Sequence, residues 1–258
     1  MPYEIRTVVE GEGQPVTLIH GVGANIESWG EVAETLAARF RVIRMDLRGH
    51  GRSTPLREPC SLEDFVADVV TALDTAGVER THLVGFSLGG MIAQLFTVTY
   101  PERVNRLALF SAVAGRTPEE RAKVMQRARM LREEGIASVV AAAEERWFTA
   151  AFRAAKPEKV KKRLEELLAN DPISYAHAYR VFAESDVADR IHEIPRPTLV
   201  VTGENDVGSN TRMARFMCEQ IPNSKLVILP ELKHSLLVEA SDKVSQLLME
   251  FLTPHQTS

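Results

Sequence analysis

Residues 85–89 have the pattern G-x-S-x-G, with Ser87 at its centre. An apolar run ends just before this pattern, and the residues that follow it, 88–96, favour a helix. A serine on such an abrupt strand-to-helix turn has a strained backbone, and the flanking glycines let strand and helix approach closely enough to expose its hydroxyl. The pattern therefore predicts a nucleophilic serine, although G-x-S-x-G alone also occurs by chance in glycine-containing loops.

Two later residues could activate this serine. A neutral hydroxyl is a poor nucleophile, so it needs a base to accept its proton and a carboxylate to orient that base. Asp206 follows one predicted strand and His234 follows the next. Because the carboxyl ends of parallel strands meet at one edge of a sheet, the chain order Ser87, Asp206, His234 predicts a catalytic triad at that edge.

Other residues compete for two of these roles. Glu204 lies two positions before Asp206, and we expect it to be a surface or loop salt-bridge residue. His20 and His50 also lie on or beside strands, where we expect them to make structural hydrogen bonds. His234 alone follows a strand late in the chain, so we expect it to be the base.

The elements that must position these residues alternate along the chain. Short apolar runs that end at turn signals are typical of strands buried on both faces of a parallel sheet. Their alternation with amphipathic segments predicts an α/β fold with a mostly parallel β-sheet flanked by helices. Residues 61–64 resemble a capping box at the start of one such helix. We expect an edge strand at 3–9, further strands at 15–19, 41–45, 81–84, 104–110, 198–202 and 226–229, and helices at 29–38, 62–77, 210–220 and 241–252.

The alternation stops after Ser111. Residues 118–191 contain no convincing strand and consist of helical stretches broken at Gly135, Pro157 and Pro172. We therefore predict that residues 1–115 and 195–258 form the α/β core, and that residues 116–194 form an inserted helical lid. Most lid aromatics should pack within the lid or against the core. Trp147 and Phe148 are candidates for lining a substrate pocket.

The composition limits the partners. The chain has 258 residues and a net charge of −4, with acidic and basic residues interspersed, which argues against nucleic acid or an anionic membrane as a partner. The one basic cluster, residues 156–163, lies among glutamates, so we expect a solvated helix face.

No apolar run approaches the ~18 residues of a membrane span. Cys60 and Cys218 lack metal-ligand spacing, and the start of the chain lacks a leader pattern, so we predict a cytoplasmic protein without a metal or other cofactor.

These features together resemble the α/β-hydrolase superfamily over nearly the whole chain. The resemblance rests on the His20-Gly21 loop, residues 46–51, and the order of Ser87, Asp206 and His234. It implies that the acid is the residue three positions after the glycine that ends its strand, which selects Asp206 over Glu204.

The attacked carbonyl also needs donors for its developing negative charge. The backbone N–H of Leu88, at the start of a helix, is one expected donor. The resemblance implies that the backbone N–H of Val22 is the second, so that Val22 and Leu88 together form the oxyanion hole.

The overall pattern is most similar to carboxylesterases and 3-oxoadipate enol-lactonase-like enzymes. This similarity implies hydrolysis of a small carboxylic ester or lactone through an acyl-enzyme. Ser87, in place of an aspartate, argues against haloalkane dehalogenase and epoxide hydrolase chemistry. Open alternatives are a carbon–carbon bond hydrolase of ring-cleavage products with the same triad, a slow-turnover ligand receptor on the same fold, and a cofactor-free perhydrolase or lyase. Residues 206–210 lack a proline that is frequent in this loop of the family.

Overall fold

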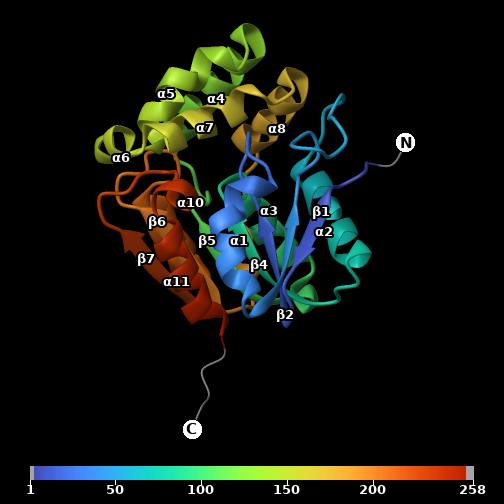
Figure 1. The fold of residues 1–258 in the computed structure, drawn as a ribbon. Helices are drawn as coiled ribbons and strands as arrows, with labels where there is room; N and C mark the ends of the chain where they lie inside the picture. The colour runs from blue at the N-terminus through green and yellow to red at the C-terminus, as the bar shows by residue number, and fades with distance from the viewer. Residues whose placement is uncertain (1–2, 254–258) are drawn as a thin grey trace.

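The computed structural model describes residues 3–253, and within them one seven-stranded sheet runs through the molecule (Figure 1). The strand order is β1-β3-β2-β4-β5-β6-β7. The first strand pairs antiparallel with its neighbour at the edge, and every other pairing is parallel. The strands are β1 (Thr7–Glu10), β2 (Gln14–Ile19), β3 (Phe40–Met45), β4 (Thr81–Phe86), β5 (Val104–Phe110), β6 (Thr198–Gly203) and β7 (Ser224–Leu229).

Helices cover both faces of this sheet, which confirms the predicted fold class. One face packs against α1 (Gly30–Ala37), α10 (Leu236–Glu239) and α11 (Ser241–Leu252). The other packs against α2 (Leu62–Thr75), α3 (Leu88–Thr99) and α9 (Thr211–Gln220). Along β5, Leu107 and Leu109 pack on the face covered by α2, α3 and α9. Ala108 and Phe110 pack on the face covered by α1, α10 and α11. Because alternate side chains of a strand point to opposite faces, a strand buried on both sides must be apolar throughout.

Local signals in the sequence explain several helix boundaries. The predicted capping box is present at the start of α2, where the Ser61 side chain accepts the N–H of Asp64 and the Asp64 carboxylate accepts the N–H of Ser61. Within residues 3–253, four short helices lie outside the predicted set: η1 (Ile26–Trp29), which precedes α1, η2 (Pro101–Arg103), η3 (Ile191–Glu193) and α10. The edge strand also begins four residues later than expected, at Thr7.

Five helices between β5 and β6 form the lid, which lies over the carboxyl-terminal edge of the sheet (Figure 1). Gly135 follows the first of them with a φ of 79°, and Pro157 and Pro172 begin the last two, as expected from the sequence. The predicted domain boundaries at 115/116 and 194/195 stay a prediction. The lid helices are α4 (Pro118–Glu134), α5 (Ala137–Trp147), α6 (Ala150–Ala155), α7 (Pro157–Leu168) and α8 (Pro172–Glu184).

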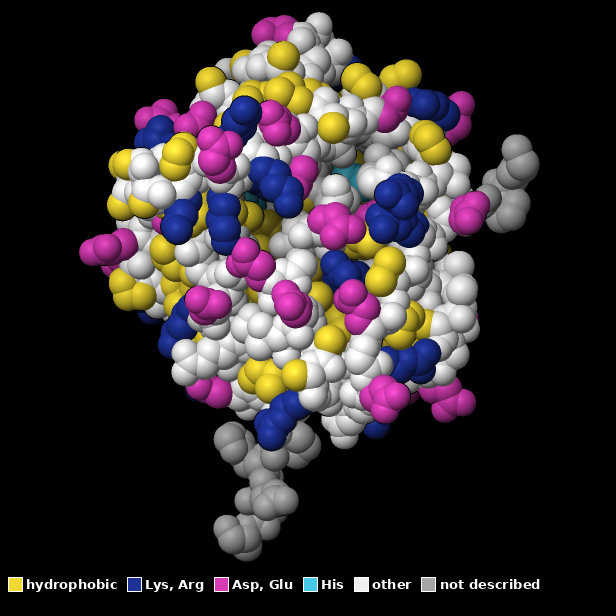
Figure 2. All heavy atoms as spheres, viewed as in Figure 1, with side chains coloured by type: hydrophobic (Ala, Val, Ile, Leu, Met, Phe, Trp, Pro, Cys, Tyr) yellow, Lys and Arg dark blue, Asp and Glu magenta, His cyan; other side chains and the backbone are white. Residues whose placement is uncertain are grey.

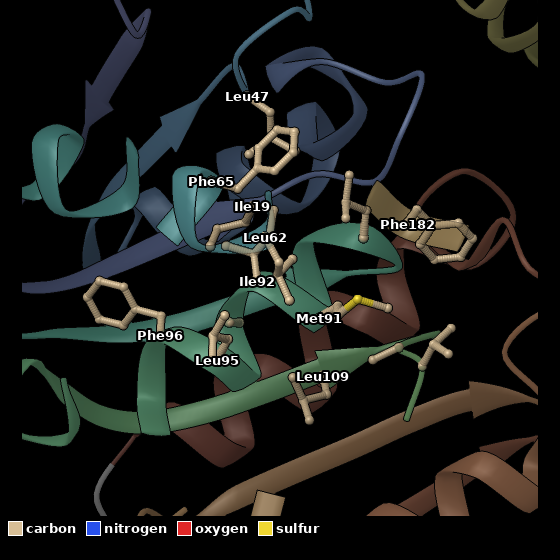
Figure 3. Close-up of a cluster of buried hydrophobic side chains, with 14 of the residues drawn as sticks. Ile19, Leu47, Leu62, Phe65, Met91, Ile92, Leu95, Phe96, Leu109 and Phe182 are labelled. Atoms are coloured by element: carbon tan, nitrogen blue, oxygen red, sulfur yellow. The ribbon is translucent and has the colours of Figure 1, made fainter. Parts of the chain in front are cut away.

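The lid joins the sheet in two ways. Its two connecting segments meet at Asp186, whose carboxylate accepts the N–H groups of Gly115 at 3.0 Å and Arg116 at 3.1 Å. Its apolar side chains also continue the core cluster on the α3 face, which reaches Phe182 of α8 from Met91 of α3 (Figure 3). The lid is therefore packed against the core and tied to it at its root.

Every helix within residues 3–253 is too short or too polar to cross a membrane.

Candidate active site

Ser87 occupies the turn between β4 and α3 and adopts a strained backbone, with φ 55° and ψ −114°. A conformation of this kind costs about 1–3 kcal/mol for a residue with a side chain and persists only when its surroundings impose it. Here the N–H of Ser87 donates to the carbonyl of Phe110 at 2.9 Å, and the Ser87 carbonyl accepts the N–H groups of Gly90 and Met91. These bonds fix the serine between the sheet and the first turn of α3.

The two glycines of the pattern are needed for close backbone approach. A Cβ atom on Gly85 would lie 2.2 Å from the carbonyl oxygen of Gly89, and one on Gly89 would lie 2.3 Å from the carbonyl oxygen of Ile19. Both distances are far below van der Waals contact with rigid backbone. The spacing G-x-S-x-G is therefore required by the packing of α3 against β2 and β4.

His234 lies beyond the end of β7 and contacts the carboxylate that follows β6. The Nδ1 atom of His234 lies 2.7 Å from Oδ2 of Asp206. Since an ionised carboxylate can only accept, Nδ1 carries a proton, and in the neutral imidazole the lone pair is therefore on Nε2. The ring of Phe86 packs 5.1 Å from the imidazole, centroid to centroid. Ser87 and His234 line the same cavity, whereas Asp206 lies behind the histidine and is 3% exposed.

Asp206 is held in its ionised form. Burial raises the pKa of its carboxyl, but His234 and the backbone N–H groups of Ser209 and Gly208 outweigh burial, so the pKa lies below its ordinary value. The two N–H groups each donate to Oδ1 at 2.9 Å, which leaves Oδ2 for the histidine. By contrast, Glu204 is exposed and its carboxylate accepts the N–H of Glu231.

Two buried histidines hold the loops beside Ser87. The Nε2 atom of His20 accepts the N–H of Leu47, and that of His50 accepts the N–H of Gly23, each at 3.0 Å. Burial lowers the pKa of His20 to about 4 and that of His50 to about 3, so both are neutral at pH 7. The structural role expected for these histidines agrees with this geometry. Val22, two residues after His20 in the loop that follows β2, lines the cavity.

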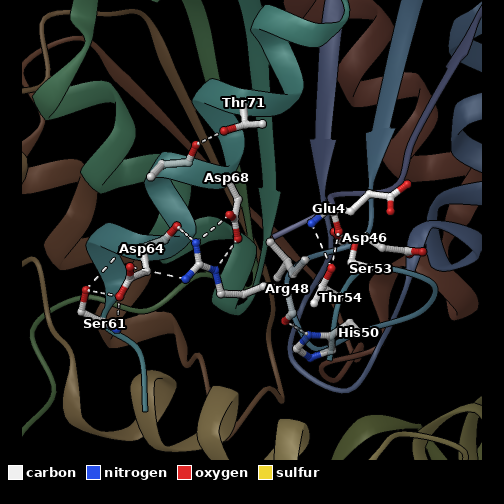
Figure 4. A network of polar contacts seen from close by, with 12 residues as sticks. Glu4, Asp46, Arg48, His50, Ser53, Thr54, Ser61, Asp64, Asp68 and Thr71 are labelled. Carbon is white, nitrogen blue, oxygen red and sulfur yellow. Dashed lines mark hydrogen bonds and ion pairs between the residues drawn. The ribbon is translucent and has the colours of Figure 1, made fainter. Parts of the chain in front are cut away.

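The loop at residues 46–53 is anchored by a polar network (Figure 4). The Arg48 guanidinium donates to both carboxylate oxygens of Asp68, at 2.6 and 2.7 Å. The Asp46 carboxylate accepts the N–H groups of Ile26 and Arg52, which ties this loop to the segment after β2. This part of the family pattern therefore supports the site from behind and does not face the cavity.

The lid closes the cavity over Ser87 with aromatic and basic side chains. Trp147 lines the cavity, and its contact with substrate stays a prediction. Phe148 does not line it, contrary to expectation: it is fully buried and stacks on Phe152, with ring centroids 5.8 Å apart. Because α5 ends at Trp147, the next residue leaves the helical path and its side chain turns into the lid interior. The other aromatic lining residues are Phe86, Tyr175, Tyr179 and Phe182.

Three arginines of the lid, which were not among the expected site residues, also line the cavity. They are Arg127 on α4, Arg146 on α5 and Arg163 on α7. The expectation of a solvated face for residues 156–163 is wrong for Arg163. A usable signal exists in the sequence, because each arginine stands three, four or seven residues from buried apolar residues of its own helix, which places them on the same face. These neighbours are Val124 and Leu131, Val139 and Ala143, and Val160 and Leu167.

Within the described part of the chain, His, Cys, Asp and Glu side chains form no group of three or more that could hold a metal ion.

Comparisons with known proteins identify the family. The profile described as alpha/beta hydrolase fold matches residues 14–241. The (E)-2-((N-methylformamido)methylene)succinate hydrolase of Acinetobacter baylyi is 33% identical over 246 residues, which cover 94% of this chain and 92% of that protein. The 3-oxoadipate enol-lactonase 2 of the same organism is 30% identical over 210 residues, covering 81% and 78%.

A solved structure agrees with these matches. The enol-lactonase from Burkholderia xenovorans LB400 superposes with a TM-score of 0.91 at 25% identity, covering 98% of this chain and 100% of that one. With a profile match over most of the chain and a relative above 30% identity, the protein belongs to the α/β-hydrolase family of enzymes.

Proposed function

We propose that the protein is a serine hydrolase that cleaves a small carboxylic ester or lactone through Ser87, His234 and Asp206. One observation carries this proposal: the strained Ser87 turn and His234, held at 2.7 Å by a buried ionised carboxylate, face one cavity. The names of the enol-lactonase relatives support the same reaction class.

The proposed reaction has two halves. The Nε2 atom of His234 accepts the hydroxyl proton of Ser87 while the serine oxygen attacks the substrate carbonyl, and His234 then returns the proton to the departing alkoxide. A water molecule, deprotonated by His234, attacks the acyl-enzyme and releases the acid with Ser87 restored. Asp206 keeps the imidazole in the required tautomer and stabilises its protonated form.

The proposed oxyanion hole is supported by backbone hydrogen bonding. Within residues 3–253, the backbone N–H groups of Val22 and Leu88 donate no hydrogen bond to a protein acceptor. Leu88 begins α3, where the helix dipole also favours negative charge. We assign these two donors to the substrate oxygen, where one such donor contributes about 3–4 kcal/mol to the transition state.

Catalysis by Ser87 is tested with a panel of p-nitrophenyl acetate, a small lactone and a ring-cleavage dienoate. We expect sustained turnover of an ester or lactone, labelling of native protein by a fluorophosphonate, and loss of both in Ser87→Ala. Turnover that survives Ser87→Ala contradicts the mechanism. Exclusive turnover of the dienoate supports the carbon–carbon hydrolase alternative, and a single burst without further turnover supports the receptor alternative.

The cytoplasmic location is also a proposal. Cys60 and Cys218 are free thiols in the structure. Free thiols suit a reducing compartment.

A further inference from the structure

The cavity above Ser87 has a basic wall formed by one arginine from each of three lid helices. Arg127, Arg146 and Arg163 are all partly buried and line the cavity together with Ser87 and His234. Each lies on the apolar, inward face of its helix, where a cation is normally avoided. These three arginines therefore belong to the cavity wall and not to the solvated surface of their helices.

These arginines lack the acidic partners that buried cations normally have. Within residues 3–253, Arg146 and Arg163 take part in no side-chain hydrogen bond or ion pair, and Arg127 donates from Nε to the Tyr179 hydroxyl at 3.1 Å. The Nη1 atom of Arg163 is buried without a partner, while its guanidinium lies 4.8 Å from the centre of the Trp147 ring. Arg48, in contrast, is matched by both oxygens of Asp68.

Electrostatics make this arrangement costly in the free protein. Burial lowers the pKa of Arg146 and of Arg163, and repulsion from Arg127 lowers that of Arg146 further. A desolvated cation is tolerated when an anion of good geometry pairs with it. The face drawn in Figure 2 carries acidic and basic side chains side by side, in contrast to the three arginines that line the cavity.

We propose that the substrate carries a free carboxylate, and that Arg127, Arg146 and Arg163 bind it while its ester or lactone carbonyl lies at Ser87. This inference rests on the proposed function and adds the substrate class. The planar guanidinium fork matches a carboxylate with two parallel hydrogen bonds, and such charge-assisted bonds are among the strongest in proteins. The aromatic walls leave the rest of the substrate in apolar contact, as expected for a small organic acid.

Two esters of equal shape test the proposal in turnover. In 4-nitrophenyl hydrogen succinate the acyl chain ends in a carboxylate, and in 4-nitrophenyl 4-methylpentanoate it ends in a neutral isopropyl group. We expect kcat/KM of the native enzyme to favour the acidic ester at least tenfold. Arg146→Met and Arg163→Met should each reduce that preference at least tenfold, mainly through KM. Lys161→Met removes an exposed cation of α7 and should keep the native preference.

A binding measurement separates this proposal from the proposed reaction. Calorimetry on Ser87→Ala, with succinate, neutral succinamide or inorganic phosphate, should detect succinate alone, and Arg146→Met added to that variant should weaken succinate at least tenfold. Succinate binding without ester turnover in the native enzyme would refute the reaction and keep the carboxylate site. Tighter binding of phosphate than of succinate, equal binding of succinamide, or a native preference for the neutral ester would overturn the carboxylate assignment.

Discussion

The N–H of Gly23 donates to Nε2 of His50 across 3.0 Å, and this bond joins the proposed oxyanion loop to the loop that follows β3. The bond requires a lone pair on Nε2, so it exists only while His50 is neutral. Nδ1 of the same ring lies 3.0 Å from the carbonyl of Arg48, which fixes the proton on Nδ1. The position of the loop that contains Val22 thus depends on the protonation state of a buried histidine.

Stability should therefore fall in mild acid. The pKa of His20 is lowered to about 4 and that of His50 to about 3, against about 6.5 in an unfolded chain. Below pH 6.5 the unfolded state binds protons that the folded state rejects, so stability is full above pH 6.5 and is lost as pH falls toward 4. Each histidine contributes a slope of up to about 1.4 kcal/mol per pH unit. Urea unfolding at pH 7.5, 6.5, 5.5 and 4.5 measures it.

His50→Asn is the informative variant for this slope. It should be less stable than the native protein at pH 7.5 and should lose less stability between pH 6.5 and 4.5. His192→Asn, at an exposed position, should keep the native slope. An unchanged slope in His50→Asn would show that this histidine is not the source of the acid sensitivity.

The close approach at the serine turn predicts a steric effect of Gly89→Ala. The new methyl would lie 2.3 Å from the Ile19 carbonyl oxygen and 2.6 Å from that of His20. Because both obstacles are backbone, we expect a loss of at least about 2 kcal/mol in unfolding free energy and a displaced Ser87. Gly30→Ala, where no atom lies within 4 Å of the added carbon, is the matched control and should leave stability nearly unchanged. Equal stabilities of the two variants would contradict the packing argument.

The choice between two acidic residues predicts opposite results for two variants. Asp206→Asn replaces the acceptor of the His234 Nδ1–H by a group that favours the wrong tautomer, and kcat should fall about 10³- to 10⁴-fold. Glu204→Gln changes an exposed side chain and should retain most of the native rate. Steady-state kinetics on the best ester of the panel decide the question. Loss of activity in Glu204→Gln with a normal rate in Asp206→Asn would reverse the assignment of the acid.

Much of the fold could be predicted because its signals are local. The capping box at Ser61 and the helix starts at Pro157 and Pro172 depend on residues within one turn. The meeting of Asp206 and His234 follows from parallel topology, since both come after strands that end at one edge. These features need no knowledge of how the lid packs.

The cavity wall could not be predicted in the same way, because it depends on how lid helices rotate about their axes and where they end. Arg163 lies among other charged residues in the sequence. Only its spacing to the buried Val160 and Leu167 indicates that its side chain points inward. Phe148 follows the last residue of α5, where helical periodicity no longer predicts direction. Tertiary packing decides such positions.

The root of the lid predicts a variant that separates lid anchoring from catalysis. The Asp186 carboxylate accepts three backbone N–H groups, from Gly115, Arg116 and Ala188, and so clamps both connecting segments. Asp186→Ala leaves these donors without their acceptor and should cost about 1–3 kcal/mol. Since the lid supplies the wall of the cavity while Ser87 and the histidine lie on the core, KM should rise more than kcat falls.

Hydrogen exchange measured over the lid helices tests the same variant directly. Amides of α4 and α8, which flank the clamp, should exchange faster in Asp186→Ala, while those of β4 and β5 keep their native rates. Asp189→Ala, which removes a nearby exposed carboxylate, is the control and should change neither exchange nor KM. Uniformly faster exchange in the lid and the sheet would mean that Asp186 stabilises the whole fold, and that the lid does not open as a separate unit about its root.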